Sequence, residues 1–129
     1  MPAWTALVTV LIVAEYYAFT LPVLLARRRT GIRAPAMSGH PDLDRAIRVH
    51  LNTHEKLMVV LPLLWVAAFT VGDRPAAIAA AAWAATRLVY AVGYLRSARG
   101  RTLGSLLGDV FEFALLGMAL VGAVGAVRG

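Results

Sequence analysis

The fold is decided by the first long apolar stretch, residues 3–26, which reads AWTALVTVLIVAEYYAFTLPVLLA. Glu15 is the only charged side chain in it. A bilayer core of ~30 Å needs ~20 helical residues to cross it, so this stretch can span a membrane by itself. Three more apolar stretches follow, at about residues 57–71, 76–94 and 103–127. The sequence therefore predicts four membrane-spanning helices.

Composition leads to the same class of protein. Of the 129 residues, 60% are hydrophobic and 16% are charged, and the mean hydropathy is +0.70. Roughly half of a small soluble domain is apolar, so these values exclude a soluble domain, a disordered chain and a fibrous repeat. Because lipid cannot hydrogen-bond the backbone, we expect an all-α fold. Residues 1–129 would form a single four-span transmembrane domain, in which the second helix begins near Asp42 and the N-terminal stretch is a retained span.

Basic residues are distributed unevenly over a chain whose formal net charge is +6. In or beside the first connection are Arg27, Arg28, Arg29, Arg33, Arg45 and Arg48, and in the third are Arg96, Arg99 and Arg101. The positive-inside rule then predicts an integral multi-pass protein with loops one and three in the cytoplasm and both termini outside. The arginine-rich, alanine-rich composition indicates a GC-rich genome, and we expect the membrane to be a bacterial plasma membrane. These arginines could also act as topology signals alone, and no aromatic-rich basic platform for nucleic acid is present.

Cysteine is absent, so the chain forms no disulfide, no thiolate metal site and no thiol nucleophile of its own. Any sulfur chemistry must come with a ligand. The chain has three histidines, and His50 and His54 lie off the polar stripe described next, so we expect no metal site.

Polar residues at membrane depth are costly and usually face the bundle interior or a water-filled cavity. In the second helix, Arg48, Asn52 and Glu55 are spaced by four and three residues, which places a cation, an amide and a carboxylate on one stripe. Asp44 and Arg45 flank that stripe one turn nearer the loop. The stripe therefore predicts a binding surface.

The third helix has a comparable face, provided that the helix extends beyond the membrane. Residues at three- and four-residue steps on it are Trp83, Arg87, Tyr90, Tyr94, Ser97 and Arg101. Its upper part, Tyr90 to Arg101, would approach Arg48 and Asn52 and form a polar cleft with them.

A structural interpretation of this face stays open beside the functional one. Arg87 would pair with Glu15, Asp109 or Glu112 to hold the bundle together, and this is the interpretation that we favour for Arg87. The tyrosines would then form an interfacial belt. This structural interpretation gives no role to Asn52 or to Arg101, which follows the paired tyrosines.

Two segments resemble the MAPEG family, the membrane-associated proteins in eicosanoid and glutathione metabolism. RVHLNTHE, residues 48–55, is similar to the family signature R-x-x-x-N-x-x-E. TRLVYAVGYLRSARGRTLG, residues 86–104, is similar to the R-x-x-Y-x-x-x-Y segment and its following basic turn, as in the microsomal glutathione transferases. The two occur in family order, and the resemblance covers nearly the whole chain.

The resemblance implies a homotrimer of four-helix subunits that binds glutathione near the cytosolic surface, in clefts between neighbouring subunits. Glutathione is implied as a co-substrate, held by Arg27, Arg48, Asn52, Glu55, Tyr90 and Tyr94. Arg101 matches the catalytic arginine that faces the thiol. Arg28 is a weaker candidate, since three successive arginines blur the register. Lys56 departs from the pattern, because some members carry tyrosine there.

These residue types suit the chemistry. Arginines bind carboxylates bidentately, and an ammonium group needs an acidic partner such as Glu55. A fixed guanidinium at Arg101 would favour the thiolate form of the bound thiol. The function predicted is a membrane glutathione transferase or peroxidase that acts on a hydrophobic electrophile or a lipid hydroperoxide taken from the bilayer.

Two other classes remain as alternatives. A non-catalytic MAPEG-like protein would bind a lipid or a partner without activating a thiol. A small multidrug exporter would use Glu15 as its coupling carboxylate, but the cluster of Arg48, Asn52 and Glu55 would then have no role.

Overall fold

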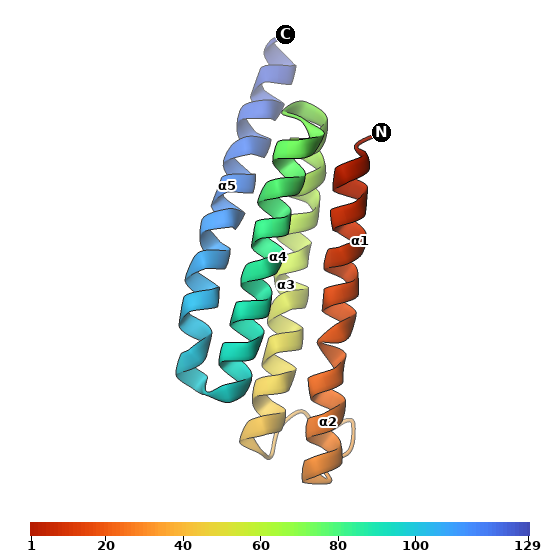
Figure 1. Ribbon diagram of the computed structural model, residues 1–129, viewed down its shortest axis with the longest axis vertical. Coiled ribbons are helices and arrows are strands. Elements are labelled where there is room, and N and C mark those ends of the chain that lie inside the picture. The colour runs from red at the N-terminus through yellow and green to blue at the C-terminus, as the bar shows by residue number, and fades with distance from the viewer.

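The computed structural model describes residues 1–129 as helices joined by one long loop, residues 31–40, and by short connections elsewhere, with no strand. The helices are α1 (Ala3–Ala18), α2 (Thr20–Thr30), α3 (Pro41–Thr70), α4 (Asp73–Arg96), the short 3-10 helix η1 (Ala98–Gly100) and α5 (Arg101–Arg128). They form four spans, each long and apolar enough to cross a membrane. Neighbouring spans run in opposite directions, and both termini lie at the same end (Figure 1). The predicted all-α, four-span membrane fold is confirmed.

The first span is two helices in line. α1 ends at Ala18 and α2 begins at Thr20. Pro22 explains the interruption, because it has no N–H to donate to the carbonyl of Ala18 and its ring crowds that carbonyl. Hydropathy alone predicted a continuous span and did not locate this break.

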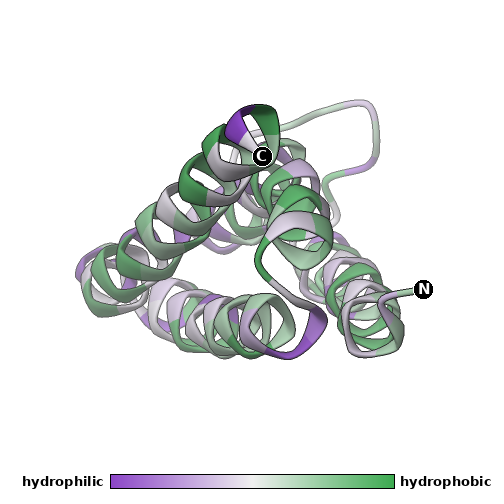
Figure 2. Ribbon diagram, turned by 90° about the horizontal axis from the view of Figure 1, so that it is seen from above, coloured by the Kyte–Doolittle hydropathy of each residue, from purple (hydrophilic) through white to green (hydrophobic).

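The outer surface of the bundle is apolar. Only 29 of the 129 residues are buried, so most hydrophobic side chains face outward, as lipid contact requires. Green, hydrophobic stretches run along every long helix in Figure 2, whereas purple residues appear at the α3–α4 turn and near the C-terminus. The core between the helices is built around Trp83, Leu64 and Leu115, which are fully buried.

α3 begins before its apolar stretch does, as predicted. Gly31 ends α2 with a φ of 72°, a left-handed conformation that glycine adopts without strain. After the loop, the His40 ring nitrogen Nδ1 accepts a hydrogen bond from the Asp42 backbone N–H at 3.1 Å, and Pro41 is the first helical residue. The polar first turns of α3 therefore extend beyond the apolar part of the span.

At the opposite end, the α3–α4 turn is fastened to the start of α1. The Asp73 carboxylate accepts hydrogen bonds from the backbone N–H groups of Trp4 and Thr5, at 3.0 Å and 2.7 Å. These N–H groups belong to the first turn of α1 and have no partner within their own helix. The contact therefore links elements nearly seventy residues apart in the sequence.

Candidate functional site

The turn between α4 and α5 brings Arg101 back over α4. α4 ends at Arg96, Ser97 is extended, and the Ser97 hydroxyl accepts a hydrogen bond from the Gly100 backbone N–H at 3.1 Å. Gly93 and Gly100 make this reversal possible, because a Cβ at Gly93 would lie 2.1 Å from the Gly100 carbonyl oxygen. The prediction that Ser97 and Arg101 continue the face of the third helix is therefore wrong.

Arg101 nevertheless reaches the predicted tyrosines. It is the first residue of α5, and its guanidinium carbon lies 5.4 Å from the centre of the Tyr94 ring. That distance is within the range of a cation–π contact. The Tyr90 and Tyr94 rings are 5.7 Å apart, so a continuous aromatic surface leads from Arg101 into the bundle. The chain reversal therefore brings Arg101 to the tyrosines, which helix extension was expected to do.

α5 packs closely against α4 at Tyr90. A Cβ at Gly104 would lie 2.2 Å from the Tyr90 backbone nitrogen, and one at Gly108 would lie 3.2 Å from the Thr86 hydroxyl oxygen. Both glycines are buried. Small residues at this four-residue spacing allow two helices to approach within backbone contact, which keeps the first turns of α5 beside Tyr90.

A polar cavity of about 300 Å³ lies where α3, α4 and α5 meet. Its lining residues are Asn52 from α3, Tyr90 from α4, and Arg101, Thr102, Ser105 and Leu106 from α5. The structure thus brings together three of the residues predicted from the sequence: Asn52, Tyr90 and Arg101. Thr102 and Ser105 were not predicted. The signal for Ser105 is its four-residue spacing from Arg101, which places both on one face of α5.

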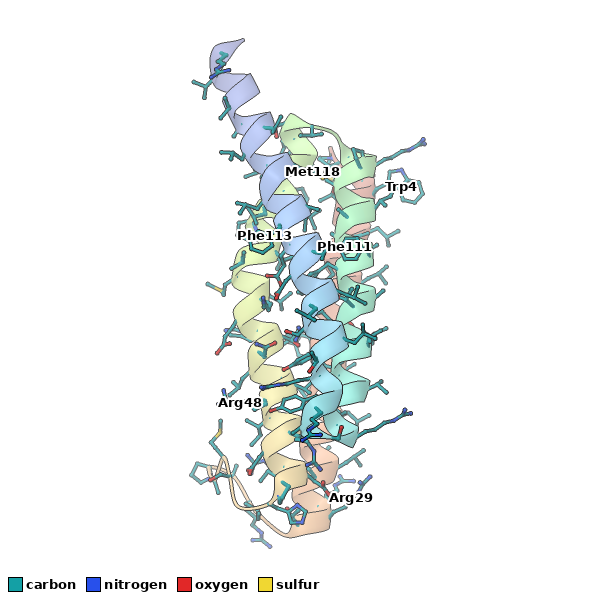
Figure 3. All side chains as sticks on the ribbon, turned by 90° about the vertical axis from the view of Figure 1, so that its left-hand side faces the viewer. Trp4, Arg29, Arg48, Phe111, Phe113 and Met118 are labelled. Atoms are coloured by element: carbon teal, nitrogen blue, oxygen red, sulfur yellow. The ribbon has the colours of Figure 1, made fainter.

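Arg48 and Glu55 flank Asn52 on α3 but do not line the cavity. Both side chains are exposed, and neither forms a hydrogen bond or an ion pair within the chain. Figure 3 places Arg48 in the half of the bundle that carries the long loop, with Arg29 beyond it and Trp4 at the opposite end. A cation and a carboxylate are therefore available on the same stripe as Asn52.

Arg27 has a different setting. Its guanidinium donates hydrogen bonds to two carbonyl oxygens of the following loop, those of Ile32 at 3.3 Å and Ala36 at 2.8 Å. Within one chain, the structure does not bring Arg27 to the cavity. Arg28 is exposed beside it, and both line a separate surface hollow at that loop.

Arg87 does not have the partners expected of it. One guanidinium nitrogen, Nη2, donates to Asn52 Oδ1 and to the Thr53 hydroxyl, each at 2.9 Å. Its guanidinium carbon lies 4.0 Å from the centre of the Tyr90 ring. Arg87 forms no ion pair, so the prediction that it pairs with Glu15, Asp109 or Glu112 is wrong. Two of those carboxylates are held by another cation, described below.

Comparison with known proteins agrees with this geometry. The family model for MAPEG matches residues 5–121. The chain belongs to the MAPEG family. An uncharacterized protein of Synechocystis sp. is 36% identical over 125 residues, which cover 97% of this chain and 91% of that protein. The leukotriene C4 synthases of Cavia porcellus and Mus musculus are 33% and 32% identical over 120 residues, covering 93% of this chain and 80% of each synthase.

Membership identifies the chain as an integral membrane protein of a glutathione-related enzyme family, and the predicted resemblance is confirmed. In this MAPEG protein the two motif segments come from α3 and from α4 with its following turn. They meet at the cavity through Asn52, Tyr90 and Arg101.

Lys56, the position that departs from the family pattern, turns toward α5 in this MAPEG protein. Its ammonium nitrogen lies 2.9 Å from Asp109 Oδ1 and 2.8 Å from Glu112 Oε2. The other oxygen of Glu112 accepts a hydrogen bond from the Trp83 indole N–H at 3.0 Å. This cluster ties α3, α4 and α5 together one turn along α5 from Ser105, and it occupies the carboxylates that Arg87 was expected to bind.

The histidines of α3 contact α1, away from the cavity. The His50 ring stacks on Tyr16 with centres 4.6 Å apart, and the His54 ring lies 5.7 Å from the same tyrosine. No group of three or more metal-binding side chains comes together in the chain.

Proposed function

We propose that this MAPEG protein is a membrane-bound glutathione transferase or peroxidase that activates the glutathione thiol beside Arg101. The observation that carries the proposal is the cavity in which a guanidinium, an amide and a phenol meet at one end of a membrane-spanning bundle. These are the groups needed to hold a peptide and to stabilise a thiolate. The similarity to leukotriene C4 synthases supports the same chemistry.

Arg101 would act electrostatically. A free thiol with a pKa near ~8.5 is mostly protonated at neutral pH, and the thiolate is the nucleophile. A guanidinium does not give up its proton in proteins, so Arg101 cannot serve as a base, and the thiol proton would leave to water. A thiol pKa lower by ~2 units requires roughly 2.7 kcal/mol of differential stabilisation. One charge-assisted hydrogen bond in a partly dry cavity is of that order.

The remaining contacts would come from the α3 stripe and from a neighbouring subunit. Arg48 is free to bind a carboxylate of the tripeptide, and Glu55 is free to bind its ammonium group. Tyr90 and Tyr94 supply phenols beside the peptide. Because Arg27 lies apart from the cavity of its own chain, we assign it to a cleft between subunits of a homotrimer.

The second substrate would enter from the bilayer, because the cavity lies between helices whose outer faces are apolar. The thiolate sulfur would attack an electrophilic carbon to form a thioether, while a bond from that carbon to a leaving group, an epoxide oxygen or a polarised double bond breaks and the released electron pair is protonated by water. Alternatively, it would attack the terminal oxygen of a lipid hydroperoxide, so that the O–O bond breaks, the lipid leaves as an alcohol after protonation by water, and the sulfur becomes a sulfenic acid. The thiol of a second glutathione would then displace water from that sulfenic acid to form the disulfide. The arginine-rich end of the bundle, which carries the α2–α3 and α4–α5 connections, would face the cytoplasm.

The test is thiolate absorbance on adding glutathione to the purified protein in detergent, with Arg101→Ala compared with wild type. Arg99→Ala is the matched control, because Arg99 is exposed two residues away and its side chain forms no hydrogen bond or ion pair within the chain. We expect a thiolate band in wild type and Arg99→Ala and its loss in Arg101→Ala. Glutathione binding without a thiolate in wild type would favour a non-catalytic binding protein instead.

Affinity measurements test the rest of the site. Arg48→Ala and Glu55→Ala should each weaken glutathione binding by about tenfold, the loss expected when one hydrogen bond to a charged group is removed. Unchanged affinity in both variants would exclude the α3 stripe as the binding surface.

A further inference from the structure

Arg87 is a buried cation that touches two walls of the cavity without lining it. Only 1% of its surface is exposed. Its Nη2 donates to Asn52 Oδ1, and its guanidinium carbon lies 4.0 Å from the Tyr90 ring centre. Asn52 and Tyr90 both line the cavity, whereas Arg87 does not. Arg87 therefore lies directly behind the polar wall that a ligand would meet.

The hydrogen bonds of Arg87 are directed at α3 alone. Nη2 also donates to the Thr53 hydroxyl at 2.9 Å, and that hydroxyl donates in turn to the Val49 carbonyl oxygen at 2.8 Å. The Nε atom of Arg87 is buried without a partner. A buried arginine that serves only stability is expected to pair with a carboxylate. Even then, a protein with apolar residues in place of a buried ion pair is often as stable as the original. Arg87 instead donates to an amide and a hydroxyl.

This arrangement decides which end of the Asn52 amide a ligand meets. A guanidinium carries only donors, so it donates to the amide oxygen and cannot hydrogen-bond to the amide NH₂ group, which is also a donor. With Oδ1 held by Arg87, the Nδ2 hydrogens are the polar atoms of Asn52 that remain for the cavity. Nδ2 makes no hydrogen bond within the chain.

We propose that Arg87 is a positioning residue that locks the Asn52 amide with its N–H donors toward the ligand. The ligand atom bound at Asn52 is then a hydrogen-bond acceptor, namely a carbonyl or carboxylate oxygen or the thiolate sulfur itself. This inference rests on the proposed function for the identity of the ligand. The locking of the amide is a property of the free protein.

The sequence offers an unusually clean probe of that locking. Asn52 is the only asparagine in the chain, and there is no glutamine. In protein labelled with 15N at its side-chain amides, the Asn52 NH₂ group therefore gives the only such pair of signals in the NMR spectrum. The variant is Arg87→Met, which replaces the guanidinium with an unbranched, apolar side chain and adds no amide.

We expect one sharp NH₂ pair in wild type and a shifted, broadened or doubled pair in Arg87→Met, because the released amide samples both orientations. Thr53→Val is the matched control, since it removes the other acceptor of the same nitrogen and Thr53 does not line the cavity. Its Asn52 pair should stay single. An Arg87→Met spectrum that matches wild type would overturn the proposal.

A double-mutant cycle on glutathione affinity links the locking to binding. Arg87→Met and Asn52→Ala should each raise the Kd by about tenfold, and the double variant should be no weaker than Asn52→Ala alone. Additive losses would show that Arg87 acts independently of Asn52 and would refute positioning. If wild type binds no glutathione while the NMR pair still responds to Arg87→Met, the proposed function fails and the locking stands.

Discussion

Gly104→Ala tests the close approach of α4 and α5 that places Arg101 beside the tyrosines. The added Cβ would lie 2.2 Å from the Tyr90 backbone nitrogen and 2.4 Å from its Cα. Both are backbone atoms, so no side chain can rotate away. One helix must shift by about 1.2 Å before ordinary van der Waals contact at 3.4 Å is restored.

The expected loss of stability follows from two opposing effects. Overpacking of a tight interface costs about 1–3 kcal/mol, and this contact is at the severe end because its neighbours are backbone atoms. Alanine in place of glycine within a helix returns about 1 kcal/mol. We therefore expect a net destabilisation of about 2 kcal/mol. A displacement of this size at a reacting centre costs on the order of 10²-fold in rate, so activity should fall far more than stability suggests.

The assay is thermal unfolding in detergent, followed by tryptophan fluorescence, to which the buried Trp83 contributes, together with thiolate formation on adding glutathione. Gly117→Ala is the matched control, because its Cβ would meet nothing within 4 Å on the same helix. We expect Gly117→Ala to unfold at or above the wild-type temperature and Gly104→Ala well below it. Equal unfolding temperatures for the two variants would refute the close helix crossing.

Two further predictions concern contacts outside the cavity lining. Lys56→Met should lower the free energy of unfolding by about 1–3 kcal/mol, because Asp109 and Glu112 lose the cation between them. Asp109→Asn in the same background should recover part of the loss. A denaturation midpoint unchanged by Lys56→Met would contradict this prediction. Asp73→Ala should lower the unfolding temperature, because it leaves the Trp4 and Thr5 backbone N–H groups without an acceptor. Asp44→Ala, at an exposed position with no such contact, should not lower it. Equal unfolding temperatures for the two variants would show that the Asp73 cap of α1 contributes nothing.

The site could be predicted in part from helical spacing. Asn52 and Tyr90 lie on stripes with period near 3.6, and they do meet at the cavity. Spacing failed beyond Arg96, where the continued helical face was expected to carry Arg101. The extended backbone at Ser97 and the contact between Gly93 and Gly100 reverse the chain there, and a periodicity argument assumes that the helix continues.

Charge pairing was the other limit of prediction. Arg87 and Lys56 both had carboxylates within plausible reach, and sequence alone offered no way to divide Asp109 and Glu112 between them. The structure gives both carboxylates to Lys56 and leaves Arg87 to Asn52 and Thr53. Arg87 was expected to hold the bundle together through an ion pair. With this assignment it instead contacts Asn52 in the cavity wall, and we propose that it orients that amide.

The amino-acid sequence by itself determined that the chain crosses a membrane four times as helices, because span length and apolarity are local properties that lipid acts on directly. It also determined the family, through two motifs on different helices. Tertiary structure alone decided which cation holds which carboxylate, where α4 ends, and how closely Gly104 approaches Tyr90. Those features depend on distances between segments far apart in the chain, and no spacing along one helix encodes them.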